Sequence, residues 1–200
     1  MSVAGLVLAA GAGRRIGGPK ALLEFGGSTL VQRCAETLSR GGCTPVVAVI
    51  GAEAARVMRP ARVATRCVAV NPDWRQGVSS SLRTGLALLR GTDTRAAVVA
   101  LVDQPLISAA VVERLLHAWG GHEAAVVATY GGLPRNPVLL DRSVWEQVAD
   151  TAVGDEGARA WLRGHADAVV RIACDDAGAP DDIDTPEDLE RLRAVVSANR

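Results

Sequence analysis

The sequence predicts an α/β fold of three layers, in which a mainly parallel sheet is covered by helices on both faces. Apolar runs typical of β-strands alternate with helical segments along the chain, which is the pattern of parallel sheets. Two runs, Val3–Ala10 and Ala96–Val102, are almost wholly apolar, as expected for central strands buried on both faces. The other strand-type runs are Pro45–Ile50, Cys67–Val70, Ala124–Thr129, Pro137–Leu140 and Val169–Ala173.

Helical segments fill the intervals between these runs, and several follow Ser, Thr or Asp in an N-cap position. The segment Tyr130–Asn136, YGGLPRN, interrupts the alternation with turn residues and predicts a β-hairpin insertion or an antiparallel edge. Since no stretch has the composition of a linker or a repeat, residues 1–200 are expected to form one domain. The predicted helices are Thr29–Arg40, Ala52–Met58, Ser79–Leu89, Ala109–Trp119, Ser143–Ala149, Glu156–Arg163 and Pro186–Ala198.

Charge and composition limit the classes of function. The 22 basic residues balance 22 acidic ones, so the net charge gives no general attraction to nucleic acid or to an anionic membrane. The apolar N-terminus lacks the basic region of a signal peptide, and no apolar run approaches the roughly 20 residues that span a bilayer. The 4 cysteines form no CxxC pair. We expect a cytoplasmic protein that binds neither nucleic acid nor membrane.

The loop after the first strand carries the clearest functional signal. The stretch AAGAGRRIGGPKALLEFG contains Lys20, and all other residues in the basic total of 22 are arginine. Open α/β sheets bind ligands at the carboxyl ends of their strands, where this loop begins. Gly11 and Gly13 allow positive φ and a nest of converging N–H groups, and Arg14, Arg15 and Lys20 add positive charge. The loop therefore predicts a phosphate-bearing ligand.

Three kinds of phosphate loop must be distinguished. A Walker A loop needs a Lys-Ser or Lys-Thr pair directly after glycine, whereas here Pro19 precedes Lys20 and Ala21 follows it. A dinucleotide fingerprint needs a helix that begins within the glycines, and Pro19 and Gly26-Gly27 interrupt that segment. A long loop that wraps a nucleoside triphosphate and closes it with a lysine agrees with all the residues. A solvated turn is the remaining alternative.

Two carboxylates are candidate metal ligands. Asp103 follows the apolar strand and emerges at the carboxyl edge of the sheet, and Asp184 precedes the last helix. Mg²⁺ is often held by a few carboxylates and by substrate phosphates, which suits these two side chains if the fold brings them together. The alternatives are a turn or N-cap role for Asp103 and a helix-dipole role for Asp184.

Three consecutive serines follow the third strand in the segment NPDWRQGVSSSLRTGL. Hydroxyls at the positive end of a helix can bind a base, a ribose or a phosphate, and we expect Ser80 and Ser81 to contact the nucleotide. Plain N-capping is the alternative for one of them. Arg75 and Gln76 are possible helpers, and Trp74 is expected to be a packing residue.

The motif LAAGAGRRIGGPK resembles the L-A-A-G-x-x-x-R-x-G-x-x-K signature of the MobA-like nucleotidyltransferases, most closely the branch of molybdenum cofactor cytidylyltransferases. Further segments agree in order: QGVSSSLRTGL, VDQPLI, NPVLL, GDEGARAWL and DIDTPEDLERL. The resemblance implies a Rossmann-like nucleotidyltransferase fold, with Lys20, Arg14 and Asp103 as catalytic residues and Ser81 against the nucleobase. It implies Mg²⁺ on Asp103 and Asp184. The implied nucleotide-binding residues are Leu8, Ala9, Ala10, Gly11, Gly13, Arg14, Arg15, Lys20, Ser80 and Ser81.

The resemblance also implies the substrates. The acceptor would be molybdopterin carrying molybdenum, with a molybdoenzyme as a possible delivery partner, and Asn136, Asp155 and Arg159 are candidates for acceptor contact. The alternative for Arg159 is an ion pair with Asp155 at i,i+4 on one helix. Ala10 resembles the cytidylyl branch, since the guanylyl branch usually has glycine there, so CTP is expected in preference to GTP. Other phosphorylated acceptors, namely a sugar phosphate, methylerythritol phosphate or phospholactate, stay open. A non-catalytic nucleotide-binding accessory protein and a dinucleotide-binding oxidoreductase are alternatives from other classes.

Overall fold

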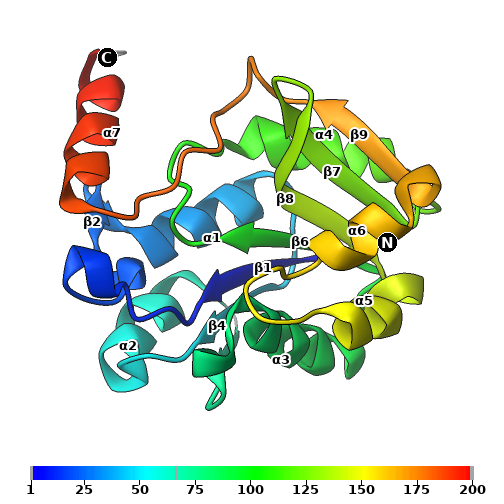
Figure 1. Ribbon diagram of the computed structural model, residues 1–200, viewed down its shortest axis with the longest axis horizontal. Helices are drawn as coiled ribbons and strands as arrows, with labels where there is room; N and C mark the ends of the chain where they lie inside the picture. Colours follow the sequence, from blue (N-terminus) through cyan, green and yellow to red (C-terminus); the bar gives the residue numbers. More distant parts are fainter. Residues whose placement is uncertain (1, 66, 199–200) are drawn as a thin grey trace.

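A seven-stranded sheet in the order β5-β4-β1-β6-β8-β7-β9 forms the centre of the computed structural model, which describes residues 2–65 and 67–198. Figure 1 shows its strands side by side across the middle of the molecule, with helices on both sides. All neighbouring strands are parallel except β8, which is antiparallel to β6 and β7. The strands are β1 Val3–Ala9, β4 Val46–Ile50, β5 Cys67–Val70, β6 Ala96–Leu101, β7 Ala125–Tyr130, β8 Leu133–Asp141 and β9 Val169–Ala173.

Seven α-helices complete the described part of the chain: α1 Leu30–Arg40, α2 Ala54–Ala64, α3 Val78–Arg90, α4 Ala109–Trp119, α5 Trp145–Thr151, α6 Arg159–Gly164 and α7 Pro186–Ala198. The apolar residues of α1, α2 and α4 pack in one core cluster, on one face of the sheet. Those of α3, α5 and α6 pack in a second cluster, on the opposite face. The predicted three-layer α/β/α fold is therefore confirmed. No described helix combines the length and apolarity that crossing a bilayer requires.

The hairpin predicted from YGGLPRN is present, and it builds the antiparallel part of the sheet. Gly131 and Gly132 form its turn with φ values of 56° and 76°. Strand β8 begins at Leu133, four positions before the expected start at Pro137, and lies between β6 and β7. The antiparallel strand is thus inside the sheet and not at its edge, because β8 pairs with both neighbours.

Two helix boundaries differ from the prediction by more than two residues, for identifiable reasons. Helix α2 continues past Met58 and through Pro60 to Ala64, because Val57 and Ala61 lie on one face and are both fully buried. Helix α6 begins at Arg159 and not at Glu156, since the preceding residues form a loop that contacts the start of α3.

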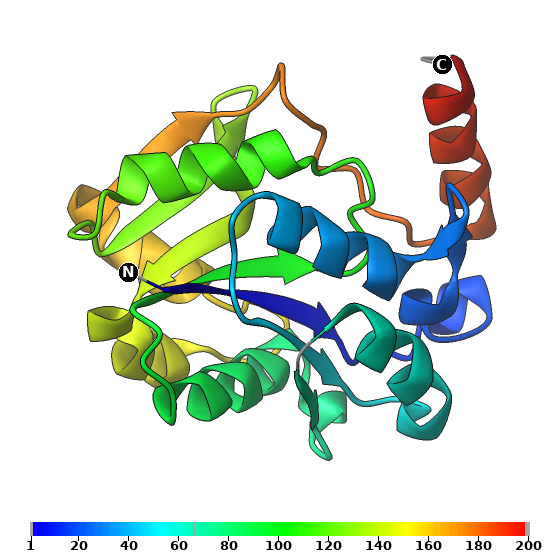
Figure 2. The ribbon, with the colours of Figure 1, turned by 180° about the vertical axis from the view of Figure 1, so that it is seen from behind.

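A small hairpin and the last helix form one end of the molecule. Strands β2 (Glu24–Phe25) and β3 (Ser28–Thr29) pair around Gly26-Gly27, and this hairpin was not predicted from the sequence. Arg193 of α7 donates a hydrogen bond of 2.7 Å to the carbonyl oxygen of Glu24. Figure 2 shows α7 beside this hairpin, close to the end of the sheet where β1 and β6 finish. This end of the molecule carries the loops predicted to bind a ligand.

Candidate active site

The loop after β1 contains a tight turn at Gly13. Gly13 has a left-handed φ of 56°, and its carbonyl oxygen accepts hydrogen bonds of 3.1 Å from the N–H groups of Ile16 and Gly18. A Cβ atom at Gly13 would lie 2.0 Å from the carbonyl oxygen of Gly18, so only glycine allows this turn. The expectation of a positive φ is confirmed at Gly13, whereas Gly11 is not among the glycines with a left-handed backbone.

The fold brings Asp184 to Asp103 through a backbone contact. The N–H of Ile183, a fully buried residue, donates a hydrogen bond of 2.9 Å to the carbonyl oxygen of Asp103. Beside it, the Gln104 amide donates a hydrogen bond of 3.0 Å to the carboxylate of Asp182. The segment before α7 is therefore attached to the end of β6, and the two predicted metal ligands lie next to each other.

The Lys20 ammonium lies between these two carboxylates. Lys20 Nζ is 2.6 Å from Asp103 Oδ2 and 2.6 Å from Asp184 Oδ1, and the guanidinium of Arg15 is 3.2 Å from the other oxygen of Asp184. Burial lowers the pKa of Lys20, but the charges and hydrogen bonds of Asp103 and Asp184 outweigh it and raise the pKa above 10.5. The hydrogen bond from Lys20 holds the pKa of Asp184 below its ordinary value. The Lys20 ammonium and the Asp184 carboxylate are therefore both charged at neutral pH.

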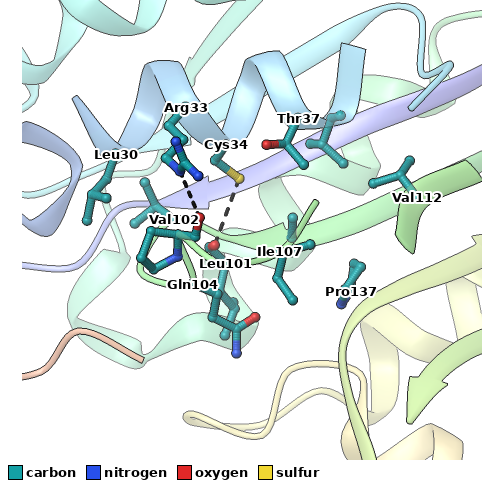
Figure 3. A pocket seen from close by; sticks show the side chains of 13 residues that line it. Leu30, Arg33, Cys34, Thr37, Leu101, Val102, Gln104, Ile107, Val112 and Pro137 are labelled. Carbon is teal, nitrogen blue, oxygen red and sulfur yellow. Dashed lines mark hydrogen bonds between the residues drawn. The ribbon is translucent and has the colours of Figure 1, made fainter. Parts of the chain in front are cut away.

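Helix α1 contacts the chain on both sides of Asp103. Arg33 Nε donates a hydrogen bond of 2.7 Å to the carbonyl oxygen of Pro105, and Cys34 Sγ lies 3.8 Å from the carbonyl oxygen of Leu101. Figure 3 shows both side chains pointing from α1 toward the end of β6, across a small cavity of about 10 Å³. Burial raises the pKa of the Cys34 thiol to about 12, so this thiol is a packing group.

A cavity of about 740 Å³ opens in front of this cluster. It contains most of the predicted site residues and is open enough for a ligand of nucleotide size. Ala9 and Ser80 do not line it, since the side chain of Ala9 is buried in the core and that of Ser80 is bonded within the protein. The lining residues are Leu8, Ala10, Gly11, Ala12, Gly13, Arg14, Arg15, Lys20, Trp74, Arg75, Gln76, Gly77, Val78, Ser81, Leu101, Val102, Asp103, Asp155 and Asp184.

Ser80 and Ser81 differ in their surroundings, although the buried Asn71 contacts both. Asn71 Nδ2 donates hydrogen bonds to Ser80 Oγ at 2.8 Å and to Ser81 Oγ at 3.0 Å. Ser80 Oγ in turn lies 2.8 Å from the carbonyl oxygen of Gly77, whereas Ser81 lines the cavity. Sequence reasoning missed Asn71 because Asn-Pro after a strand reads as a plain turn. Asn71, at the end of β5, positions the hydroxyl of Ser81.

Asp155 caps helix α3 although 77 residues separate it from Val78. Its Oδ1 accepts a hydrogen bond of 3.1 Å from the N–H of Val78, and the carbonyl oxygen of Gly154 accepts one of 2.9 Å from the N–H of Ser79. A Cβ atom at Gly77, which has a φ of 96°, would lie 2.4 Å from the oxygen of Gly154. The alternative of an ion pair between Asp155 and Arg159 on one helix is wrong, because Asp155 precedes α6.

Trp74 was expected to be a packing residue, but it also lines the cavity. Its ring is half-buried, and the guanidinium carbon of Arg75 lies 4.4 Å from the ring centroid. Arg75 and Gln76 line the same wall. An aromatic ring beside a cation and an amide can contact the flat face and the polar edge of a nucleobase.

The donor set of Asp103 and Asp184 fits a hard divalent cation, because two carboxylate oxygens already surround one positive charge. Within residues 2–65 and 67–198, no cluster of three or more His, Cys, Asp or Glu side chains could hold a metal ion by itself. The two carboxylates therefore suit a cation that completes its coordination with water and phosphate oxygens, as Mg²⁺ and Mn²⁺ do.

Comparison with known proteins gives a consistent family. The profile of the MobA-like NTP transferase domain matches residues 5–169. Nicotine blue oxidoreductase of Paenarthrobacter nicotinovorans is 41% identical over 198 residues, which cover 95% of this chain and 96% of that protein. Molybdenum cofactor guanylyltransferase of Cereibacter sphaeroides is 33% identical over 207 residues and is matched over 98% of both chains.

Solved structures show the same fold. A nucleotidyl transferase from Methanothermobacter superposes with a TM-score of 0.84 at 19% identity, covering 100% of this chain and 99% of that one. Rv0371C of Mycobacterium tuberculosis in complex with manganese superposes with a TM-score of 0.77 at 27% identity, covering 97% and 99% of the two chains.

Proposed function

Since this chain belongs to the MobA-like NTP transferase family of nucleotidyltransferases, we propose that it transfers CMP from CTP to the phosphate of molybdenum-carrying molybdopterin and releases pyrophosphate. The observation that carries this proposal is the position of Lys20 between Asp103 and Asp184 at the mouth of the large cavity. A cation flanked by two carboxylates next to a glycine turn suits the binding of a triphosphate and a divalent metal.

The reaction is a displacement at the α-phosphorus. An oxygen of the acceptor phosphate forms a bond to that phosphorus, while the bond from the phosphorus to the oxygen that bridges to the β-phosphate breaks. The electron pair of the broken bond leaves with pyrophosphate. Because the acceptor phosphate is already ionised at neutral pH, no strong base and no covalent intermediate are needed.

The chief task of the protein is to neutralise and align two anions. Lys20, Arg14 and Arg15 supply positive charge on the loop side, and the N–H groups of the glycine turn supply further donors. Mg²⁺ or Mn²⁺ held by Asp103 and Asp184 would add positive charge to the phosphate oxygens. The manganese complex of Rv0371C supports the choice of a divalent metal for this site.

The proposed preference for CTP over GTP is based on residues that line the large cavity beside the glycine turn. Ala10 and Ser81 both line the cavity, and the methyl group of Ala10 reduces the space that a glycine would leave for a larger base. The guanylyltransferase of Cereibacter makes GTP the competing nucleotide. Molybdopterin as acceptor, a molybdoenzyme as the receiving partner and the cytoplasm as the site of action belong to the same proposal.

The relative named nicotine blue oxidoreductase favours a second candidate, a redox enzyme that binds a nicotinamide dinucleotide in the same cavity. The glycine turn could hold a pyrophosphate in either case, but carboxylates that suit a divalent metal are a feature of nucleotidyl transfer. A third candidate is a non-catalytic nucleotide-binding protein. Such a protein could bind nucleotide without Asp103 and Asp184.

Calorimetric titration with CTP, GTP, ATP and UTP, each with and without Mg²⁺, tests the proposal. Magnesium-dependent binding that is tightest for CTP, followed by pyrophosphate release with molybdopterin, is the expected result. Tighter binding of GTP would overturn the base assignment and leave the family chemistry intact. A spectral change with NADH or NADPH in place of triphosphate binding would favour the redox enzyme, and full biological activity of Asp103→Asn would favour the non-catalytic protein.

A further inference from the structure

A second hollow is separate from the large cavity and shares none of its lining residues. It has a volume of about 510 Å³ and is lined by Gln104, Arg135, Arg159, Pro180, Asp181 and Asp182. Gln104 directly follows Asp103, and Asp182 lies two positions before Asp184, and both of these carboxylates line the large cavity. Residues of the two segments that carry the carboxylate pair therefore line the second hollow as well as the large cavity.

A third, narrower space of about 50 Å³ shares lining residues with both the second hollow and the large cavity. Asp155 lines both this space and the large cavity, and Arg159 lines both this space and the second hollow. The second hollow is therefore linked to the nucleotide cavity by neighbouring lining residues, Arg159 and Asp155.

The acidic and the basic side chains that line the second hollow differ in whether they have partners. Asp181 pairs with Arg191 at 2.9 Å, and Asp182 accepts the hydrogen bond from Gln104. Arg135 and Arg159 are exposed, and neither makes a side-chain hydrogen bond or an ion pair with any residue in the described ranges 2–65 and 67–198. Two guanidinium groups thus face the hollow with their donors free, whereas each of its acids already has a partner.

The two arginines lie in regular secondary structure. Arg135 is in β8, whose register with β7 pairs it with Ala128, and Arg159 is the first residue of α6. The facing loop is attached to the hairpin turn by a hydrogen bond of 2.7 Å from the N–H of Gly131 to Asp175. In Figure 1 this loop, in orange, runs from β9 past the hairpin and down to α7.

We propose that Arg135 and Arg159 together bind the phosphate monoester of the acceptor and aim it across the carboxylate pair at the nucleotide. The proposal rests on the proposed function, and it names the residues that select an acceptor carrying a phosphate. A guanidinium is suited to this task because its fork of donors matches two phosphate oxygens, and two forks from different elements hold a dianion in one orientation.

The test is a kinetic comparison of Arg135→Ala, Arg159→Ala and the double variant with the wild type, using molybdopterin and CTP as substrates. Each single variant should raise the KM for molybdopterin about tenfold or more, as the loss of a charge-assisted hydrogen bond predicts, and the KM for CTP should stay within about twofold. Arg163→Ala is the matched control, because Arg163 is on the same helix and pairs with Glu156 at 2.7 Å. The lysine variants at both positions should recover part of the affinity.

Direct binding of molybdopterin, measured by ultrafiltration without nucleotide, separates this inference from the proposed function. An unchanged KM for molybdopterin in the double variant, with normal transfer by the wild type, would overturn the inference alone. Arginine-dependent binding of molybdopterin by a wild-type protein that transfers no CMP would support the inference and overturn the proposed function. A wild-type protein that does not bind molybdopterin would overturn the inference, while triphosphate titration still tests the nucleotide site.

Discussion

The ammonium of Lys20 donates a hydrogen bond of 2.6 Å to Asp103, a residue 83 positions further along the chain. A second hydrogen bond of the same length joins it to Asp184. The lysine that is exceptional in a chain rich in arginine therefore stands where phosphate and metal charges would meet. A compact ammonium can contact two carboxylates and then phosphate oxygens, whereas a planar guanidinium needs a fixed fork of acceptors. We infer from this difference that a lysine serves better than an arginine at this position.

Lys20 and a divalent metal should compete for the same two carboxylates. Lys20→Met keeps most of the length of the side chain and removes its charge, so Mn²⁺ should bind the nucleotide-free protein about tenfold more tightly or better. Turnover should fall about 100-fold or more, because charge stabilisation of the phosphates is lost. Electron paramagnetic resonance of free Mn²⁺ measures the affinity. Equal Mn²⁺ affinity in the two proteins would show that the ammonium does not compete.

The glycine turn should tolerate no side chain at position 13. Gly13→Ala places a methyl group where the carbonyl oxygen of Gly18 lies, so the turn must open and the affinity for nucleoside triphosphate should fall about tenfold or more. Gly18→Ala is the matched control, since nothing lies within 4 Å of a Cβ atom there. Calorimetry with one triphosphate on both variants checks this, and equal losses would mean that the turn geometry is unimportant.

The cap that Asp155 provides for α3 should appear in the stability of the protein. Asp155→Ala leaves the N–H of Val78 without its acceptor and should lower the free energy of unfolding by about 0.5–2 kcal/mol. Asp155→Asn keeps an acceptor oxygen and should cost less. Asp150→Ala, an exposed change in α5, should cost almost nothing. Urea unfolding of the three variants measures the difference, and an unaltered midpoint for Asp155→Ala would contradict the capping role.

Acid stability should depend on Asp188 at the start of α7. Hydrogen bonds from the N–H groups of Asp184 and Thr185 hold the pKa of Asp188 below its ordinary value of 3.8. Since the folded pKa is the lower one, the carboxylate stabilises the fold above about pH 4, and this contribution is lost as the pH falls through the folded pKa. Asp188→Asn should therefore weaken the dependence of unfolding on pH in this range. Urea unfolding at pH 6 and pH 3, with Glu187→Gln as the control, tests it.

Periodicity and turn chemistry were sufficient for most of the fold. The runs at Val3–Ala10 and Ala96–Val102 became adjacent central strands, because only a doubly covered sheet can bury such segments. The place of β8 between β6 and β7 was not predictable, since pairing partners depend on contacts between distant segments. The β2–β3 hairpin was missed for a similar reason: each strand has only two residues, and Phe25 is buried by the rest of the fold.

By itself, the sequence determined the chemistry available to this protein: a glycine turn with Lys20 after the first strand, carboxylates at Asp103 and Asp184, and the motifs of its family. Only the tertiary structure decided which groups meet. It attached Ile183 to Asp103, capped α3 with Asp155, committed Ser80 to internal hydrogen bonds and set Arg135 beside the same hollow as Arg159. The physical reason is that local propensities act over a few residues, whereas hydrogen bonds and burial join segments that the sequence leaves far apart.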